Sequence, residues 1–207
     1  MNIIQALEWR YATKRFDVSK KLNNEQIKQI KDILRLTPSS FGLQPWKFLI
    51  ISDDETKKKL VKHSWGQQQV ADASHVLVMC RRNIKASEMV HLYIDEMVEK
   101  TWASKDDLAG YRDMMLWFFS HMSEDAIKTW ADKQIYIALW NVMTALATLE
   151  IDACPMEWFL NDKYDEVLWL WEKGLSSVLV LPMGYRHPED DYAKRPKVRY
   201  DNEEIFG

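Results

Sequence analysis

The sequence has few of the residues on which common cofactor and metal sites depend. Only six of its 207 residues are glycine, and they form neither a Gly-rich dinucleotide fingerprint nor a Walker phosphate loop. The two cysteines, Cys80 and Cys154, lie far apart among apolar neighbours, which predicts buried thiols. The five histidines form no close pair at helical spacing, and no nucleophile elbow occurs. We therefore expect no metal site, and the sequence contains no pattern typical of a hydrolase, although residue types alone do not exclude a hydrolase triad.

A strong charge of one sign and long apolar runs are also missing. The net charge is −3, whereas nucleic acid or an anionic membrane would require a broad basic face. No run approaches the length of a membrane span, and residues 1–10 lack the basic start and continuous apolar core of a signal peptide. We expect a cytoplasmic protein that binds neither nucleic acid nor a membrane.

Two short basic runs stand out in this slightly acidic chain. The first is Arg10-Tyr11-Ala12-Thr13-Lys14-Arg15, and the second is Lys194-Arg195-Pro196-Lys197-Val198-Arg199. A run of cations is most often a solvated helix end. If the fold brings these two runs together, their shared partner is expected to be a phosphate.

Aromatic residues are abundant, with ten Trp, eight Tyr and seven Phe. Such surface serves most often as core or subunit interface, and it also suits a pocket for a flat ring. A polar loop bounded by Pro38 and Pro45 contains Ser39 and Ser40, whose hydroxyls could face a ligand or hold the loop's own turns. Together with the basic runs, these features suit a cofactor that carries a phosphate and a flat ring.

Hydrophobic periodicity and capping signals predict alternating helices and strands. Helices are expected at residues 3–10, 23–37, 53–62 and 123–149, and strands at 46–51, 76–80 and 176–181. Residues 84–122 are predicted to form a helical excursion, 152–159 a loop, and 185–207 a tail without structure signals. Residues 135–149 are apolar on nearly every face, which predicts a core helix, a dimer interface or both. The alternation predicts one α+β domain over residues 1–207, with three α/β/α layers and a mixed central sheet.

Three motifs in this order resemble the FMN-dependent nitroreductase family, of the oxygen-insensitive NAD(P)H type. The first run, continued to Phe16, is similar to an opening Arg-x-Ser/Thr-x-Lys/Arg-x-Phe signature. The segment from Pro38-Ser39-Ser40 to Gln44-Pro45-Trp46 is similar to a Pro-Ser-Ser-x-Asn-x-Gln-Pro-Trp loop, and Lys197-Val198-Arg199 to a closing Lys-x-Arg. The resemblance spans nearly the whole chain. It implies a nitroreductase-like dimeric fold, with FMN at the interface of a homodimer and residues 185–207 reaching the partner subunit.

The resemblance also implies roles for individual residues. Arg10 and Arg199 would bind the FMN phosphate with Lys197 nearby, and Lys14 would reach the pyrimidine edge of the ring. The other implied cofactor-binding residues are Tyr11, Ala12 and Thr13 along the phosphate and ribityl chain, Pro38, Ser39 and Ser40 from the other subunit, Gln67 and Gln69 beside the ring, and Pro155, Met156 and Glu157 near its reactive nitrogen.

Three residues depart from the family pattern. Gly42 stands where Asn is usual, Ala12 lacks a common hydroxyl, and Trp158 replaces a small residue beside the flavin. A bulky Trp158 is expected to restrict access to the face of the flavin ring, or to change the direction of that access, and so to affect the range of substrates. Phe119 or Phe118 could correspond to the aromatic residue that gates substrate in relatives.

The resemblance implies a ping-pong reductase. NADH or NADPH would reduce FMN and leave, and a nitroaromatic or a quinone would then receive two electrons, with no side chain required as chemical acid or base. Two alternatives remain open. A flavin reductase, enone reductase or dehalogenase of the same superfamily would keep FMN and change the acceptor. A non-catalytic nucleotide-binding protein would use the basic runs and the Trp-rich surface to bind a partner.

Overall fold

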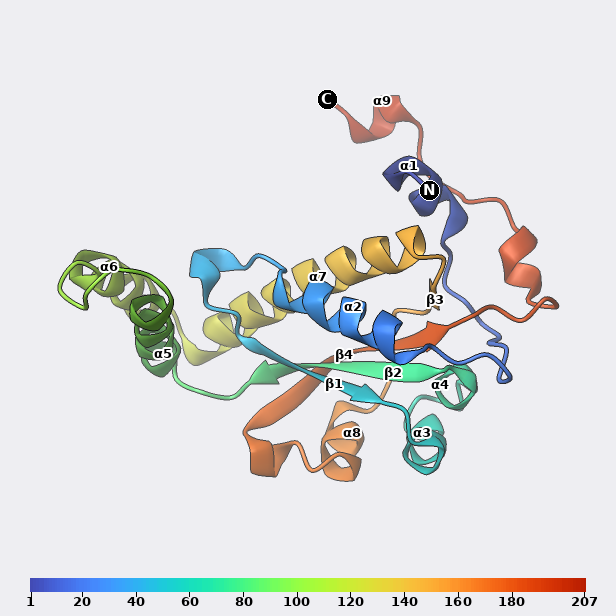
Figure 1. Ribbon diagram of the computed structural model, residues 1–207, viewed down its shortest axis with the longest axis horizontal. Helices are drawn as coiled ribbons and strands as arrows, with labels where there is room; N and C mark the ends of the chain where they lie inside the picture. The colour runs from blue at the N-terminus through green and yellow to red at the C-terminus, as the bar shows by residue number, and fades with distance from the viewer.

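A four-stranded sheet forms the middle of the computed structural model, which describes residues 1–207 (Figure 1). Its strands are β1 (Trp46–Ile51), β2 (His75–Arg82), β3 (Asp152–Ala153) and β4 (Leu175–Gly184), in the spatial order β1-β2-β4-β3. All three strand pairs are antiparallel, and the one parallel pairing is an isolated bridge between Ala12 and Ala153. A mixed sheet was expected, but the strands pair only in the antiparallel direction. The residue pattern predicts where strands form and does not predict the direction in which distant strands pair.

Strand β2 shows why helices cover both faces of the sheet. Leu77 and Met79 pack into one core, whereas Val76, Val78 and Cys80 pack into another, and all five residues are fully buried. This alternation follows from the two-residue period of a strand. Helices α2 (Asn24–Arg35) and α7 (Glu124–Thr148) lie on the first face, and α3 (Asp54–Val61), α4 (Gln69–Asp72) and α8 (Asn161–Val167) on the second (Figure 1). The predicted α+β class and its three layers are confirmed.

Two predicted helix starts are confirmed at the level of hydrogen bonds. Asn23 caps α2 through a complete capping box with Gln26, and Ser123 caps α7 by accepting from the backbone N–H of Ala126. Most of α7 packs into the first core, yet Ile137 and Trp140 remain exposed. The helix is thus a core helix with one uncovered apolar side.

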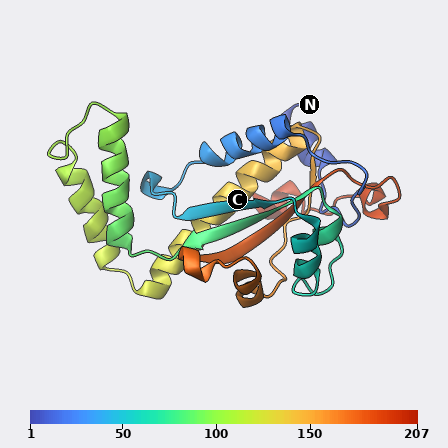
Figure 2. The ribbon, with the colours of Figure 1, turned by 60° about the horizontal axis from the view of Figure 1, so that its bottom comes forward.

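Residues 84–122 contain a pair of helices that project from one end of the sheet (Figures 1 and 2). They are α5 (Ala86–Lys100) and α6 (Ala109–Ser120). Their facing sides form a third core that includes Met89, Ile94, Met115 and Phe119. The excursion is therefore stabilised by apolar contacts of its own, in addition to its chain connections to β2 and α7.

The N- and C-terminal segments lie together at the other end of the molecule. Helix α1 (Ile3–Trp9) stands beside the C-terminal tail, which contains η3 (Asp191–Lys194) and α9 (Asn202–Ile205) (Figure 1). The tail was expected to lack structure, and strand β3 lies in a segment expected to be a loop. Elements of two to four residues are too short to show a hydrophobic period. None of the helices is both long and apolar enough to cross a membrane.

Candidate cofactor site

The two basic runs meet at the end of α1. Arg10 is the C-cap of this helix, and the ammonium of Lys197 donates to the Arg10 carbonyl oxygen. Burial lowers the pKa of Arg10, and the positive charge of Arg199 lowers it further. Burial, Arg10 and Arg199 likewise lower the pKa of Lys197. The fold thus brings together three cations from opposite ends of the chain.

No carboxylate compensates these three charges. Arg10, Lys197 and Arg199 form no ion pair, and the only side-chain hydrogen bonds of the set go to the backbone carbonyls of Arg10 and Val198. Cations that repel one another and have no carboxylate partner are stabilised by an anion with several acceptor oxygens. We name Arg10, Lys197 and Arg199 the cation clamp.

Asp190 holds the loop that follows Arg10. Its carboxylate accepts hydrogen bonds from the Tyr11 hydroxyl at 2.9 Å and from the backbone N–H groups of Lys14 at 2.9 Å and Arg15 at 3.0 Å. Burial acts to raise the pKa of Asp190, but these hydrogen bonds outweigh it and lower the pKa. No sequence pattern indicates this residue, because Asp190 stands among other acidic residues of the tail.

A second carboxylate anchors the same loop from below. Asp152 is nearly buried and accepts from the backbone N–H and the Nε of Arg186, each at 2.8 Å. The Arg186 guanidinium lies 4.0 Å from the centre of the Trp9 ring and 4.7 Å from that of Tyr11. Asp152 also accepts from the hydroxyl of Thr13 at 3.5 Å. Thr13 is fully buried, so its side chain supports the loop from inside the protein.

A cavity of about 410 Å³ lies beside this loop. Six residues that the sequence singled out line it, namely Lys14, Gln67, Pro155, Met156, Glu157 and Trp158. Leu139 and Met143 of α7 and Leu179 of β4 complete its lining. Five segments far apart in the chain therefore converge on one cavity of mixed polar and apolar lining, which includes a lysine and a glutamate.

Lys14 brings an uncompensated positive charge to the cavity. Its only side-chain partner is the Cys154 sulfur, at 3.7 Å, and it forms no ion pair. Burial raises the pKa of the Cys154 thiol more than the nearby Lys14 lowers it, so the thiol stays neutral. Both cysteines are free and buried, as predicted. Because a neutral thiol does not balance an ammonium, Lys14 remains available to a ligand in the cavity.

Two loops that contribute to the cavity lining carry hydrogen-bond donors. The backbone N–H groups of Glu157 and Trp158 have no acceptor in the protein. Gln67 Nε2 donates to the Trp158 carbonyl at 3.1 Å, and the nearly buried Gln69 donates to Gln67 Oε1 at 2.9 Å. Gln69 therefore positions Gln67 and does not itself line the cavity.

Tyr136 of α7 donates a hydrogen bond to the Glu157 carboxylate. Burial and this hydrogen bond raise the pKa of Tyr136 to about 12, so its hydroxyl keeps its proton at neutral pH. The carboxylate of Glu157 is thereby held in place at the cavity. Periodicity placed Tyr136 on a helix but gave no signal for this contact.

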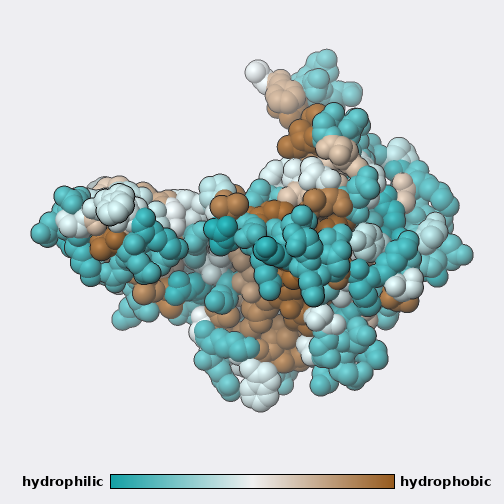
Figure 3. All heavy atoms as spheres, in the orientation of Figure 1, coloured by the Kyte–Doolittle hydropathy of each residue, from teal (hydrophilic) through white to brown (hydrophobic).

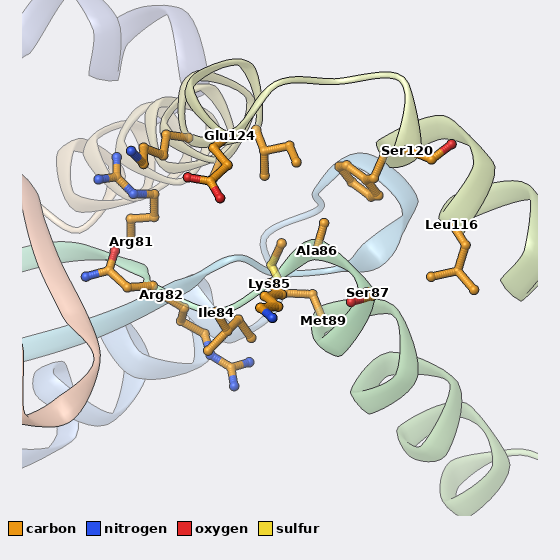
Figure 4. Close-up of a pocket in the computed structure, with 15 residues that line it drawn as sticks. Arg81, Arg82, Ile84, Lys85, Ala86, Ser87, Met89, Leu116, Ser120 and Glu124 are labelled. Carbon is orange, nitrogen blue, oxygen red and sulfur yellow. The ribbon is translucent and has the colours of Figure 1, made fainter.

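Two other sets of predicted residues lie elsewhere in the subunit. Pro38, Ser39 and Ser40 lie at the end of α2 nearer the excursion, where the Ser40 N–H donates to Gln134 of α7 at 2.9 Å (Figures 1 and 2). Phe119 lines a different cavity, of about 550 Å³, between the excursion and the start of α7 (Figure 4). Neither set lines the cavity of Lys14, so within one subunit their predicted roles have no counterpart.

The structure explains why Gly42 departs from the expected Asn. Its φ is +75°, and a Cβ atom there would lie 2.7 Å from Cζ of Tyr93, a residue of α5. Asn also adopts this φ, so the space taken by the Tyr93 ring is what favours glycine over Asn here. The departure comes from packing between this loop and the excursion.

Replacing Gly42 by alanine is expected to destabilise the protein by about 2 kcal/mol, through overpacking and an unfavourable φ. Urea unfolding followed by circular dichroism measures this change. The double variant Gly42→Ala/Tyr93→Ala removes the clashing ring and should be less destabilised than the sum of its two single changes. Strict additivity would show that Tyr93 is not the cause.

Comparison with known proteins identifies the family of this chain. The sequence profile of the nitroreductase family matches residues 7–185. A Staphylococcus epidermidis protein that carries the name NAD(P)H nitroreductase is 37% identical over 214 residues, covering 99% of this chain and 95% of its own. The oxygen-insensitive NAD(P)H nitroreductase of Salmonella typhimurium is 32% identical over 207 residues, covering 96% of this chain and 95% of its own.

A solved structure shows the same fold. It is that of a nitroreductase-type protein of Exiguobacterium sibiricum in complex with FMN, with a TM-score of 0.86 at 22% identity, covering 100% of this chain and 97% of the other. The fold and the site define an α+β protein with the cation clamp beside a cavity of mixed polar and apolar lining. The chain belongs to the nitroreductase family.

Proposed function

We propose that the protein is an NAD(P)H oxidoreductase that binds FMN between the two subunits of a homodimer. The observation that carries this proposal is the cation clamp, which lies next to a cavity lined by Lys14 and by free backbone donors. When bound, FMN accepts two electrons from NADH or NADPH and passes them to a nitroaromatic or a quinone after the oxidised nicotinamide has left.

The residues present fit each part of this cofactor. Arg10 and Arg199 offer planar guanidinium groups suited to bidentate contacts with a phosphate, and Lys197 adds a third positive charge. Tyr11 and Ala12 lie between the clamp and Lys14, on the loop that Asp190 holds. This order along the loop suits a ligand whose phosphate and ring are separated by a short chain.

The cavity supplies position and electrostatics for the ring. Lys14 would place positive charge beside a ring bound in the cavity and so would favour the negative charge that FMN gains on taking up electrons. The free N–H groups of Glu157 and Trp158 would be available as hydrogen-bond donors to such a ring. Pro155 and Met156 give the same loop an apolar wall, and backbone hydrogen bonds between Met156 and Val180 fix it to the sheet.

Uncovered apolar surface supports the homodimer. Ile3 and Ile4 of α1 and Trp140 of α7 are exposed, as are Val198 and Phe206 in the tail. Hydrophobic residues also gather below α2, where β1 forms the edge of the sheet (Figure 3). Apolar area of this extent is typical of subunit interfaces. A second copy would cover it and would bring its own Ser39 and Ser40 toward the cavity.

Cofactor uptake and turnover test this function directly. The purified protein should retain added FMN through desalting, and its flavin absorbance should fall on anaerobic addition of NADH or NADPH and return on addition of a nitroaromatic or a quinone. Its sedimentation should give the mass of a dimer. Turnover should also be measured with free flavins, enones and halogenated aromatics as acceptors. A higher rate with one of these would identify a flavin reductase, an enone reductase or a dehalogenase. A colourless protein that takes up no FMN would contradict both the proposed function and the alternative FMN-dependent enzymes.

A further inference from the structure

Two tryptophans meet at the edge of the cavity. Trp65 and Trp158 stack with ring centres 5.7 Å apart and an angle of 29° between the ring planes. Trp158 lines the cavity together with Lys14 and Glu157. Despite their contact, Trp65 is 65% exposed and Trp158 is 69% exposed. Most of this aromatic surface thus faces solvent and the cavity.

The turn under Trp65 is firmly held. Ser64 is fully buried and hydrogen-bonded both to the Leu60 carbonyl at 2.8 Å and to the Tyr164 hydroxyl at 2.6 Å. Trp65 itself has a φ of 53°, an uncommon conformation for a bulky residue. Its ring gains little burial in return, so the packing of the turn does not explain why this position carries a tryptophan.

The loop that carries Trp158 is fixed on both sides. The Trp158 carbonyl oxygen accepts a hydrogen bond from the side chain of Gln67, which stands two residues after Trp65. The next side chain, Phe159, is buried and packs edge-to-face on Tyr164 with ring centres 4.7 Å apart. The same tyrosine therefore supports both loops, and both aromatic rings project from anchored backbone.

We propose that Trp65 and Trp158 form a substrate-binding wall that selects flat aromatic electron acceptors by stacking. This inference rests on the proposed function and names two residues that determine which acceptors its site prefers. The ring of Trp158 contacts the acceptor, and the ring of Trp65 stacks on the other face of Trp158 and fixes its orientation. Rings attract one another in offset-stacked or edge-to-face geometry, which a saturated, puckered acceptor cannot reproduce. The wall therefore favours nitroaromatics and quinones over aliphatic acceptors of equal charge.

Equilibrium binding to the oxidised, FMN-loaded protein without nicotinamide tests the wall. The two probes are 4-nitrobenzoate and cyclohexanecarboxylate, which share a carboxylate and differ in the flatness of the ring and in the nitro group, so the effect of Trp158→Ala on each probe carries the test. The wild type should bind 4-nitrobenzoate more tightly, and Trp158→Ala should weaken that binding roughly tenfold while changing cyclohexanecarboxylate by less than about twofold. Trp158→Phe should retain most of the preference. Trp171→Ala, which removes an exposed tryptophan outside the cavity, should leave both affinities unchanged.

Circular dichroism of the apoprotein provides a second readout. Stacked indoles give an exciton signal, which should be present in the wild type and lost in Trp65→Ala and in Trp158→Ala. An unchanged 4-nitrobenzoate affinity in Trp158→Ala, or equal weakening of both probes, would overturn the proposal. A missing exciton signal in the wild type would overturn it too. Because neither measurement requires turnover, a wild type that binds FMN but fails to oxidise NAD(P)H would contradict the proposed function alone.

Discussion

Arg10→Ala is expected to weaken FMN binding by about 30- to 100-fold, because each hydrogen bond to a charged group contributes roughly 1.5–3 kcal/mol. The side chain of Arg10 forms no ion pair within the protein, and its position as the C-cap of α1 depends on backbone groups. The variant should therefore fold normally. Quenching of free FMN fluorescence by the apoprotein measures the dissociation constant, and the far-ultraviolet circular dichroism spectrum checks the fold.

Arg15 provides the matched control for Arg10. It lies on the same loop, carries the same guanidinium and pairs with Glu189 at 2.8 Å outside the clamp. Arg15→Ala should leave the FMN affinity within about twofold, since an exposed ion pair contributes little. Arg10→Lys should be intermediate, because it keeps the charge and loses the planar fork. Equal losses in Arg10→Ala and Arg15→Ala would indicate a general effect of basic charge instead of a specific clamp.

Asp152→Ala is expected to destabilise the protein by about 3 kcal/mol, because it removes the only carboxylate partner of Arg186 and leaves buried donors unpaired. Asp152 is 4% exposed, so water cannot replace the lost bonds at full strength. Urea unfolding measures the change. FMN affinity should also fall, since the loop from Thr13 to Lys14 loses an anchor.

Asp191→Ala is the control for this second prediction. Asp191 forms an exposed ion pair with Lys194 in the tail, and the loss of such a pair should leave stability and FMN affinity unchanged. A stability of Asp152→Ala equal to that of the wild type would show that the Asp152–Arg186 pair does not hold the loop.

Local signals in the sequence predicted most of the helices and the three longer strands. The capping box of Asn23 and Gln26 and the cap at Ser123 act within one turn of chain, so the residues alone specify them. The period-two pattern of β2 is also local. The two basic runs were visible as well, but their meeting depends on the fold.

The residues that position the site could not be predicted, because their partners are distant in sequence. Asp190 binds the loop of Lys14 across more than 170 residues, and nothing distinguishes it from the neighbouring acids of the tail. Asp152 lies in a two-residue strand that shows no period. The contact between Gly42 and Tyr93 joins a loop to the excursion, so Gly42 could be read from sequence only as a departure from a pattern.

The affinity ratio between FMN and riboflavin tests most directly whether the cation clamp binds a phosphate. The two ligands share the ring and the ribityl chain, and only FMN carries the phosphate. The wild-type protein should prefer FMN by roughly a hundredfold or more, and Arg10→Ala should lose most of that preference while its riboflavin affinity stays within about twofold of the wild type. Equal binding of FMN and riboflavin by the wild type would contradict a phosphate-binding clamp formed by Arg10, Lys197 and Arg199.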